Sequence, residues 1–433
     1  MIRKSKKQNM KYPLFIILFV LSFTANAQFN KFFHDKTLRI DYFHSGNNES
    51  EFYTIDELIE EPYWGGSKIN LLDTFDFGKY YVKVFDIEND SLIYSRGYST
   101  IFGEWQTTDE AKITSRSFRE SIVMPYPRND VRVEFYSRNK KGVFGKKFEY
   151  LVDTDDYFIS PKQRSQYPMF DVFVSGDHAN KVDIVILPEG YTKDEMGKFI
   201  DDCKVFVEDF FSFSPYSENK DKFNIRGILA PSEDSGSDIP ADLVWKNTLL
   251  NSRFYTFDLK RYCMTTDFFS VRDLAGNAPY DQIFIMINIQ KYGGGAIYNF
   301  YSACGHYTPL EDKILIHEFG HGFAGLGDEY YTSEVAYNDF YPLDIEPWEP
   351  NLTTLVDFDE KWKHLLKKNT PIPTPVDKKK FLKRLGVFEG GGYSAKGIYR
   401  PADDCLMNSF KGKKFCGACN EAIINMINFY TAD

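Results

Sequence analysis

The sequence predicts a two-domain protein, in which an N-terminal all-β sandwich precedes a C-terminal α/β domain. A chain of 433 residues exceeds what one hydrophobic core usually organises. Short segments rich in β-branched and aromatic residues fill the first part, whereas continuous apolar strands and helical periodicity begin at about residue 180. All six cysteines also lie after residue 200. These observations divide the chain into two parts of different architecture.

The first 27 residues have the pattern of a secretory signal peptide. Five basic residues precede an apolar run at 14–23, and Ala25-Asn26-Ala27 supplies small residues for cleavage. A membrane anchor is disfavoured because this run is too short to span a bilayer, and no later run reaches the about 20 apolar residues of a transmembrane helix. We therefore expect an exported protein, either periplasmic or extracellular.

The charge balance argues against nucleic acid as a partner. Removal of the leader takes away five basic and no acidic residues, which changes the formal net charge from −10 to −15. An acidic surface repels phosphate backbones, and the sequence has no stripe of Lys and Arg interleaved with aromatic residues. The mixed charges and the 40 Phe and 29 Tyr residues instead indicate a globular protein.

Residues 28–155 are expected to form the β-sandwich. Turn signals such as Glu88-Asn89-Asp90-Ser91 separate short, partly alternating segments at spacings that suit two packed sheets. The expected strands are 79–87, 91–94, 117–124, 130–136 and 147–152. The polar stretch that contains Pro161 makes residues 156–170 the expected linker. No motif in this domain carries obvious chemistry.

Residues 171–433 are expected to form the α/β domain. The apolar run 182–187 predicts a strand covered on both faces. Thr192 and Glu195 form a capping box, and the apolar residues after it recur at helical spacing. Further strands are expected at 223–229, 283–289 and 296–301, the last after a glycine triplet.

The segment ILIHEFGHGFAGLGDEYY, residues 314–331, then places two histidines four positions apart. On a helix such residues differ by about 40° in direction, so His317 and His321 share a face and can hold one metal ion. Glu318 lies beside that face, within reach of a metal-bound water. The apolar positions fall on the opposite side and are expected to pack into the core: Leu315, Phe319, Phe323 and Leu326.

Two ordinary core histidines are the alternative interpretation of this pattern. That alternative explains neither the glutamate beside them nor the glycines at 320, 322 and 325, which together cost about 2 to 3 kcal/mol relative to alanine. A catalytic zinc site also needs a third protein ligand. Asp328 and Glu329 follow the point where the helix should end; Asp328 is the first choice and Glu329 the alternative.

The run HEFGHGFAGLGDEY, residues 317–330, resembles the M64-type IgA-peptidase family of metallopeptidases, which carry H-E-x-G-H followed by D-E-Y. It is also similar to the metzincin motif H-E-x-x-H-x-x-G-x-x-H, although Ala324 stands where metzincins have glycine and Gly327 where their third histidine falls. The step from Gly325 to Asp328 matches the metzincin step from glycine to ligand, which favours Asp328. Met407, in the run DCLMNS, resembles the methionine turn beneath the metzincin metal.

The resemblance implies a zincin-like, metzincin-related catalytic domain, a β-rich N-terminal domain and a secreted zinc endopeptidase. It does not imply that immunoglobulin is the substrate. Zn²⁺ held by His317, His321 and Asp328 would make a water more acidic, and Glu318 would act as the general base. A protein or peptide substrate is expected to bind as an extended strand along residues 296–301.

Candidates for stabilising an oxyanion are His306, Tyr330 and Tyr399. Two other functions stay open: a zinc-binding adhesion or recognition module that cuts nothing, and a zinc hydrolase that acts on a non-peptide bond, such as a deacetylase. An intact Glu318 argues against the first, because binding alone needs no base.

The even number of cysteines in an exported chain favours disulfides. We expect a local bridge between Cys405 and either Cys416 or Cys419. A structural zinc knuckle at Cys416-Gly-Ala-Cys419 is not favoured, because no second cysteine pair with a suitable spacing exists.

Overall fold

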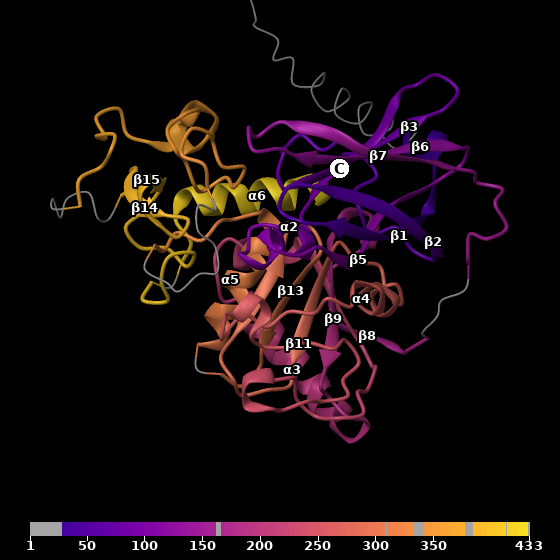
Figure 1. Ribbon diagram of the computed structural model, residues 1–433. Coiled ribbons are helices and arrows are strands. Elements are labelled where there is room, and N and C mark those ends of the chain that lie inside the picture. Colours follow the sequence, from indigo (N-terminus) through magenta and orange to yellow (C-terminus); the bar gives the residue numbers. More distant parts are fainter. Residues whose placement is uncertain are drawn as a thin grey trace, which may run out of the picture.

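The computed structural model describes residues 28–161, 166–308, 310–331, 341–376, 384–412 and 414–431. The expected signal peptide lies outside these residues. The described chain forms two antiparallel sheets, a six-stranded mixed sheet and a two-stranded sheet, which together with their helices make a two-domain layout (Figure 1). No helix among the described residues is long and apolar enough to cross a membrane.

The N-terminal domain consists of a three-stranded sheet and a four-stranded sheet. The first has the order β2-β1-β5, made of Glu51–Glu61, Phe33–Gly46 and Arg116–Pro127. The second has the order β4-β3-β6-β7, made of Leu92–Tyr98, Tyr80–Asp86, Val131–Arg138 and Phe144–Val152. Aromatic rings join the two sheets, since Phe135 of β6 lies 5.3 Å from Tyr42 of β1 and 5.5 Å from Tyr53 of β2, measured between ring centroids.

The six-stranded sheet has the order β12-β13-β11-β9-β10-β8. Its strands are Gly294–Ile297, Tyr301–Gly305, Gln282–Ile287, Val182–Glu189, Phe223–Ile228 and Met169–Val174 in that order. The four inner strands run parallel, and the edge strands β8 and β12 are antiparallel to their neighbours. Its helices are α3 (Met196–Phe210), α4 (Phe268–Ala275), α5 (Glu311–Ala324) and α6 (Gly417–Thr431).

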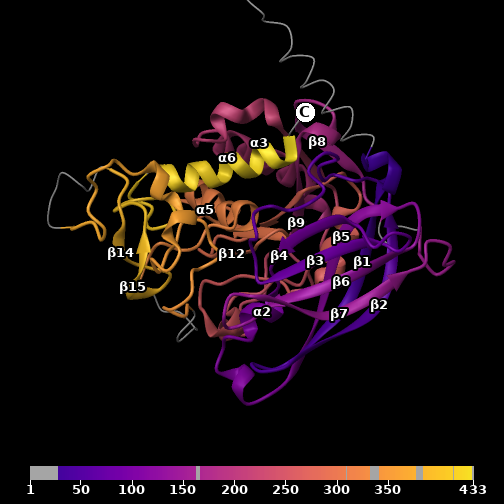
Figure 2. The same cartoon turned by 90° about the horizontal axis from the view of Figure 1, so that it is seen from above.

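Both faces of this sheet are covered, as the apolar run at 182–187 predicts. Ile184 and Ile186 of β9 belong to a core shared with α3, α5 and α6. Val185 and Leu187 point the other way, into a core shared with α4 and the N-terminal domain. Figure 2 shows α3, α5 and α6 on one side and the N-terminal sheets on the other. The predicted helix with its capping box is also confirmed, as α3.

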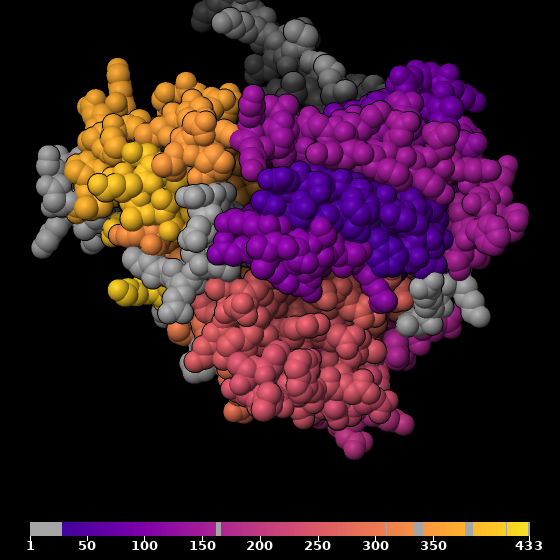
Figure 3. All heavy atoms as spheres, in the orientation of Figure 1, coloured from indigo at the N-terminus to yellow at the C-terminus, as the bar shows by residue number. Residues whose placement is uncertain are grey.

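The two domains therefore share an apolar core and lie in direct contact (Figure 3). Polar contacts extend the interface: the buried guanidinium of Arg39 on β1 pairs with Asp273 of α4 at 2.7 Å. At the other end, Arg96 of β4 donates a hydrogen bond to the hydroxyl of Tyr430 on α6, at 2.8 Å. These contacts hold the N-terminal domain in a fixed position relative to the helices that carry the site.

The strand expected at Ala296–Tyr301 is wrong in its bounds. The chain instead forms a hairpin in which Ile297 of β12 pairs with Tyr301 of β13. Asn299 makes the turn with a left-handed φ of 56°, a conformation that asparagine tolerates well. Tyr298 and Phe300 are buried in the turn, which gives the run its strand-like composition. The edge strand at this end of the sheet is β12.

The expected disulfide at Cys405 is also wrong. The sulfur atoms of Cys405 and Cys419 lie 3.7 Å apart, and those of Cys416 and Cys419 lie 3.5 Å apart. A disulfide requires about 2.05 Å. All six cysteines are buried and unbridged.

Candidate metal centre

The helix α5 carries the histidine pair and ends in a sharp reversal. Gly325 has a left-handed φ of 64°, which glycine adopts without the steric penalty of a side chain. The N–H groups of Gly325 and Leu326 donate to the carbonyls of His321 and Gly320, at 3.1 and 3.2 Å. This reversal carries the chain back past the helix, so that Asp328 faces the histidines.

The other glycines of α5 allow neighbouring segments to approach closely. A Cβ at Gly322 would lie 2.3 Å from the hydroxyl oxygen of Ser302 on β13. A Cβ at Gly320 would lie 3.2 Å from the sulfur of Met407. The helix thus packs on β13 along one side and on the loop around Met407 along another. Glycine suits these positions because a side chain there would crowd the neighbouring segment.

The structure brings His317, His321 and Asp328 together. The Nε2 atoms of the two histidines lie 3.1 Å apart, and the Oδ1 atom of Asp328 lies 3.1 and 3.3 Å from them. A tetrahedral zinc ion with ligands at about 2.0–2.1 Å separates its ligand atoms by about 3.3 Å. The triangle therefore has the dimensions that Zn²⁺ requires.

Hydrogen bonds fix both rings in the orientation that ligation needs. The Nδ1–H of His317 donates to the carbonyl of Leu406 at 2.9 Å, and that of His321 to the carbonyl of Leu326 at 2.5 Å. The Nε2 lone pairs consequently point at one another and at Asp328. Oδ2 of Asp328 accepts from the Tyr393 hydroxyl at 2.5 Å, whereas the buried Oδ1 has no hydrogen-bond donor. Three acceptors that converge in this way fit a cation.

The charges around the triad also favour a cation. Burial disfavours a charged His321, but the carboxylates of Asp328 and Glu318 outweigh burial and raise its pKa to about 9. Burial raises the pKa of Glu318, although the neighbouring imidazoles act in the opposite direction. A raised carboxyl pKa makes a carboxylate a stronger base, which suits a group that accepts a proton and returns it.

The triad and Glu318 line a cleft of about 2230 Å³. One wall comes from the β12 edge and from residues 253–262, and another from the N-terminal domain, through α2 (Ile101–Trp105). Glu104 of α2 accepts a hydrogen bond from the hydroxyl of Tyr262 across the domain boundary. Burial raises the pKa of Glu104 to about 7. Nothing in the sequence indicated this residue, because a single acid on a five-residue helix forms no motif.

Of the three candidates for stabilising an oxyanion, Tyr330 alone lines this cleft. Its ring is stacked on that of His317, with centroids 6.5 Å apart. His306 is held by Asp202 and Glu311, at 3.3 and 2.7 Å. Tyr399 pairs by its backbone with Thr353.

Arg261 also lines the cleft, and its guanidinium lies 5.8 Å from the Tyr330 ring centroid. No sequence pattern marked this arginine. It adds a positive charge to the wall that carries Tyr330.

Glu329, the alternative third ligand, faces away from the histidines. Its N–H donates to the carbonyl of Met407 at 2.8 Å, and its side chain lies next to Cys419, with Oε1 3.2 Å from the sulfur. Adjacent residues in an extended segment point to opposite sides. Asp328 and Glu329 therefore contribute to two different groups of side chains.

Comparison with known protein families assigns both domains. The family model described as IgA Peptidase M64 matches residues 170–385 and 381–427, and the model described as Peptidase M64 N-terminus matches residues 28–149. The comparison with curated proteins gives no match. Since the matches to the peptidase model extend over more than half of the chain, the protein is a peptidase of the IgA Peptidase M64 family.

Proposed function

We propose that the protein is an exported zinc endopeptidase, periplasmic or extracellular, that hydrolyses peptide bonds of extracellular proteins, including host glycoproteins. The observation that carries the proposal is the triangle of His317, His321 and Asp328 beside Glu318, on the wall of a cleft large enough for a polypeptide. Export rests on the sequence pattern of residues 1–27. Zn²⁺ in such a site supplies Lewis acidity, which polarises a carbonyl group and makes water a stronger acid.

Glu318 is the general base in this proposal. Its carboxylate takes a proton from the attacking water and passes it to the nitrogen of the leaving amine. A Cβ at Gly294 would lie 3.2 Å from the Cγ of Glu318, so the base lies directly against the edge strand. The absence of a side chain at Gly294 keeps this approach open.

The substrate is proposed to pair with β12. The N–H and carbonyl of Gly294 already face outward, where they bond to the carbonyl of Arg261 and the N–H of Cys263 at 3.1 and 3.2 Å. Outward-facing groups alternate along a strand, so those of Ala296 face the same way. Ala296 is partly exposed and lines the cleft. An extended peptide that bonds there passes next to Glu318.

Glu318→Gln provides the first test. The variant keeps the size of the side chain and removes the base, so it should bind the same amount of zinc and lose roughly 10²- to 10⁴-fold in hydrolysis rate. The assay compares parent and variant on denatured and native glycoproteins, with metal content measured on the same samples.

A panel of acetylated sugars run beside the proteins separates the alternatives. If the parent binds zinc and cuts only the acetylated substrates, it is a non-peptide hydrolase. If it binds zinc and acts on neither class, the binding-module alternative replaces the proposal.

A further inference from the structure

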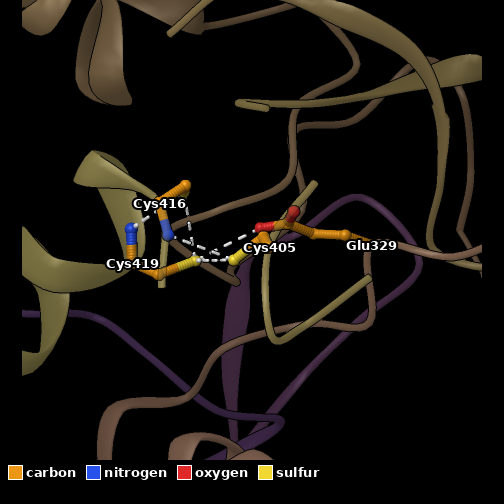
Figure 4. A group of neighbouring side chains, drawn as sticks. All are labelled: Glu329, Cys405, Cys416 and Cys419. Carbon is orange, nitrogen blue, oxygen red and sulfur yellow. Dashed lines mark hydrogen bonds between the residues drawn. The ribbon is translucent and has the colours of Figure 1, made fainter. Parts of the chain in front are cut away.

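A second group of metal-ligating side chains lies directly beyond Asp328. Glu329, Cys405, Cys416 and Cys419 are all buried, and their ligand atoms lie within 4.8 Å of one another. Figure 4 shows the four side chains converging from three separate segments of the chain. None of these residues lines the cleft.

The distances in this group fit a metal rather than a disulfide. The sulfur of Cys419 lies 3.5 Å from that of Cys416 and 3.7 Å from that of Cys405. Tetrahedral zinc with Zn–S distances of about 2.3 Å separates its sulfur ligands by about 3.8 Å. The Oε1 atom of Glu329 lies 3.2 Å from the Cys419 sulfur, near the about 3.5 Å expected between an oxygen and a sulfur ligand.

Backbone N–H groups and a helix N-terminus lie against the sulfur atoms. The backbone N–H of Cys416 donates to the sulfur of Cys405 at 3.2 Å, and the N–H of Cys419 to the sulfur of Cys416 at 3.5 Å. Cys416 and Cys419 also lie at the start of α6, where the helix dipole stabilises thiolates. The side-chain amide of Asn351 donates to Oε1 of Glu329 at 3.0 Å, while the buried Oε2 has no hydrogen-bond partner.

A buried carboxylate among three sulfur atoms is costly unless a cation compensates it. The guanidinium of Arg400 acts on Glu329 through its charge, but it donates its hydrogen bonds to the carbonyls of Glu389 and Gly390. We propose that Glu329, Cys405, Cys416 and Cys419 form a second, structural zinc site. Four protein ligands leave no position for a substrate, and soft thiolates select zinc over magnesium or calcium.

An ion in this site would hold in place the segments that carry His317 and Asp328. Cys405 is followed by Leu406 and Met407. The carbonyl of Leu406 accepts a hydrogen bond from the Nδ1–H of His317, and the carbonyl of Met407 accepts one from the N–H of Glu329. Glu329 in turn follows Asp328. One ion would thus fix the start of α6, the loop that orients His317 and the segment that presents Asp328. The second site is accordingly a positioning site, and it takes no part in the reaction itself.

Zinc counting on the purified mature chain tests the proposal. The parent should hold two zinc ions, and His317→Ala/His321→Ala should hold one. Cys416→Ser/Cys419→Ser should lose the second ion and unfold at a lower temperature. Glu329→Gln, a milder change, should keep the fold and bind the second ion at least tenfold more weakly.

Cobalt provides a readout that needs no cysteine variant. Co²⁺ bound to the His317→Ala/His321→Ala protein should show thiolate-to-cobalt charge-transfer absorption, which nitrogen and oxygen ligands do not give. A thiol count on the unfolded protein, with and without reductant, checks for a disulfide. Two thiols fewer without reductant, or a histidine double variant that binds neither zinc nor cobalt, would overturn the second site.

The second site and the proposed function fail separately. The structural ion is counted in a protein that lacks the histidines, whatever the parent does to substrates. Conversely, a parent that binds two ions and cuts nothing would refute the endopeptidase proposal and leave the second site intact.

Discussion

Gly325→Ala tests how the end of α5 builds the metal centre. The substitution puts a side chain on a residue with a φ of 64°, which costs about 1–2 kcal/mol. The new Cβ would also lie 2.9 Å from the Trp348 ring and 3.3 Å from the Tyr298 ring. One of these rings must move by a few tenths of an ångström, so we expect a total loss of about 2–3 kcal/mol in the free energy of unfolding.

Gly197→Ala is the matched control. Gly197 lies in the first turn of α3, and a Cβ there meets no atom within 4 Å. The same change in side chain should therefore stabilise the helix by up to about 1 kcal/mol. Urea titrations in the presence of a chelator measure both variants without a contribution from bound metal.

Gly325→Ala should also weaken zinc binding. Asp328 comes to the histidines through the reversal at Gly325, so a relaxed turn should displace its carboxylate and lower the affinity of the triad roughly tenfold or more. If Gly325→Ala is as stable as Gly197→Ala and binds zinc like the parent, the role assigned to this turn is wrong.

Three further changes have expected outcomes. Asp328→Asn keeps the shape of the side chain but removes its charge, so it should lower the zinc affinity of the triad by at least tenfold, as measured by competition with a chelator; unchanged affinity would point to another third ligand. Ala296→Pro removes the outward N–H of β12 and should lower kcat/KM about 3- to 30-fold with zinc content unchanged, whereas Ala296→Ser, which keeps the N–H, should match the parent. His306 supports folding below neutral pH: burial disfavours its charge, but Asp202 and Glu311 outweigh burial and raise its pKa to about 9. Its contribution to stability is fully present below the unfolded pKa of about 6.5 and is lost as the pH rises toward 9, so His306→Gln should flatten the decline of the unfolding free energy over this range, and an unchanged slope would contradict this.

The sequence predicted correctly those features that depend on a single helix or a single strand. Residues four apart on α5 share a face because of the helical repeat, and this geometry holds without knowledge of the rest of the chain. The capping box before α3 and the apolar run of β9 are equally local. The choice of Asp328 needed two further inferences, that a glycine ends the helix and that the step from Gly325 to Asp328 matches the metzincin spacing.

The missed elements depend on distant partners. β1 carries Arg39 and Asp41 within its apolar residues, which hides its strand pattern; both are buried because they pair with each other and Arg39 also pairs with Asp273. Glu104 enters the cleft because the two domains share a core. Such placements depend on contacts between residues far apart in sequence, which periodicity does not encode.

The cysteine group was missed for the same reason, because its members lie far apart in the sequence. A cysteine pair spaced C-x-x-C predicts a zinc knuckle only when a second pair is visible, but here the other ligands come from residues 405 and 329. Closeness of the ligands in sequence is therefore the wrong criterion for predicting a zinc site. A loop and a helix N-terminus that meet in the fold can supply ligands that lie far apart along the chain.

The neighbouring residues Asp328 and Glu329 connect the two groups of side chains. The carbonyl of Asp328 accepts from the N–H of Gly392 at 2.8 Å, and the N–H of Glu329 donates to Met407 on the other side at 2.8 Å. A segment bonded alternately to both sides is extended, and its successive side chains must point in opposite directions. Two neighbouring acids can therefore belong to the histidine group and to the cysteine group at once. Because they share one peptide bond, a displacement of either carboxylate is transmitted to the other, so loss of the structural ion should be detected first as weaker zinc binding at the histidines.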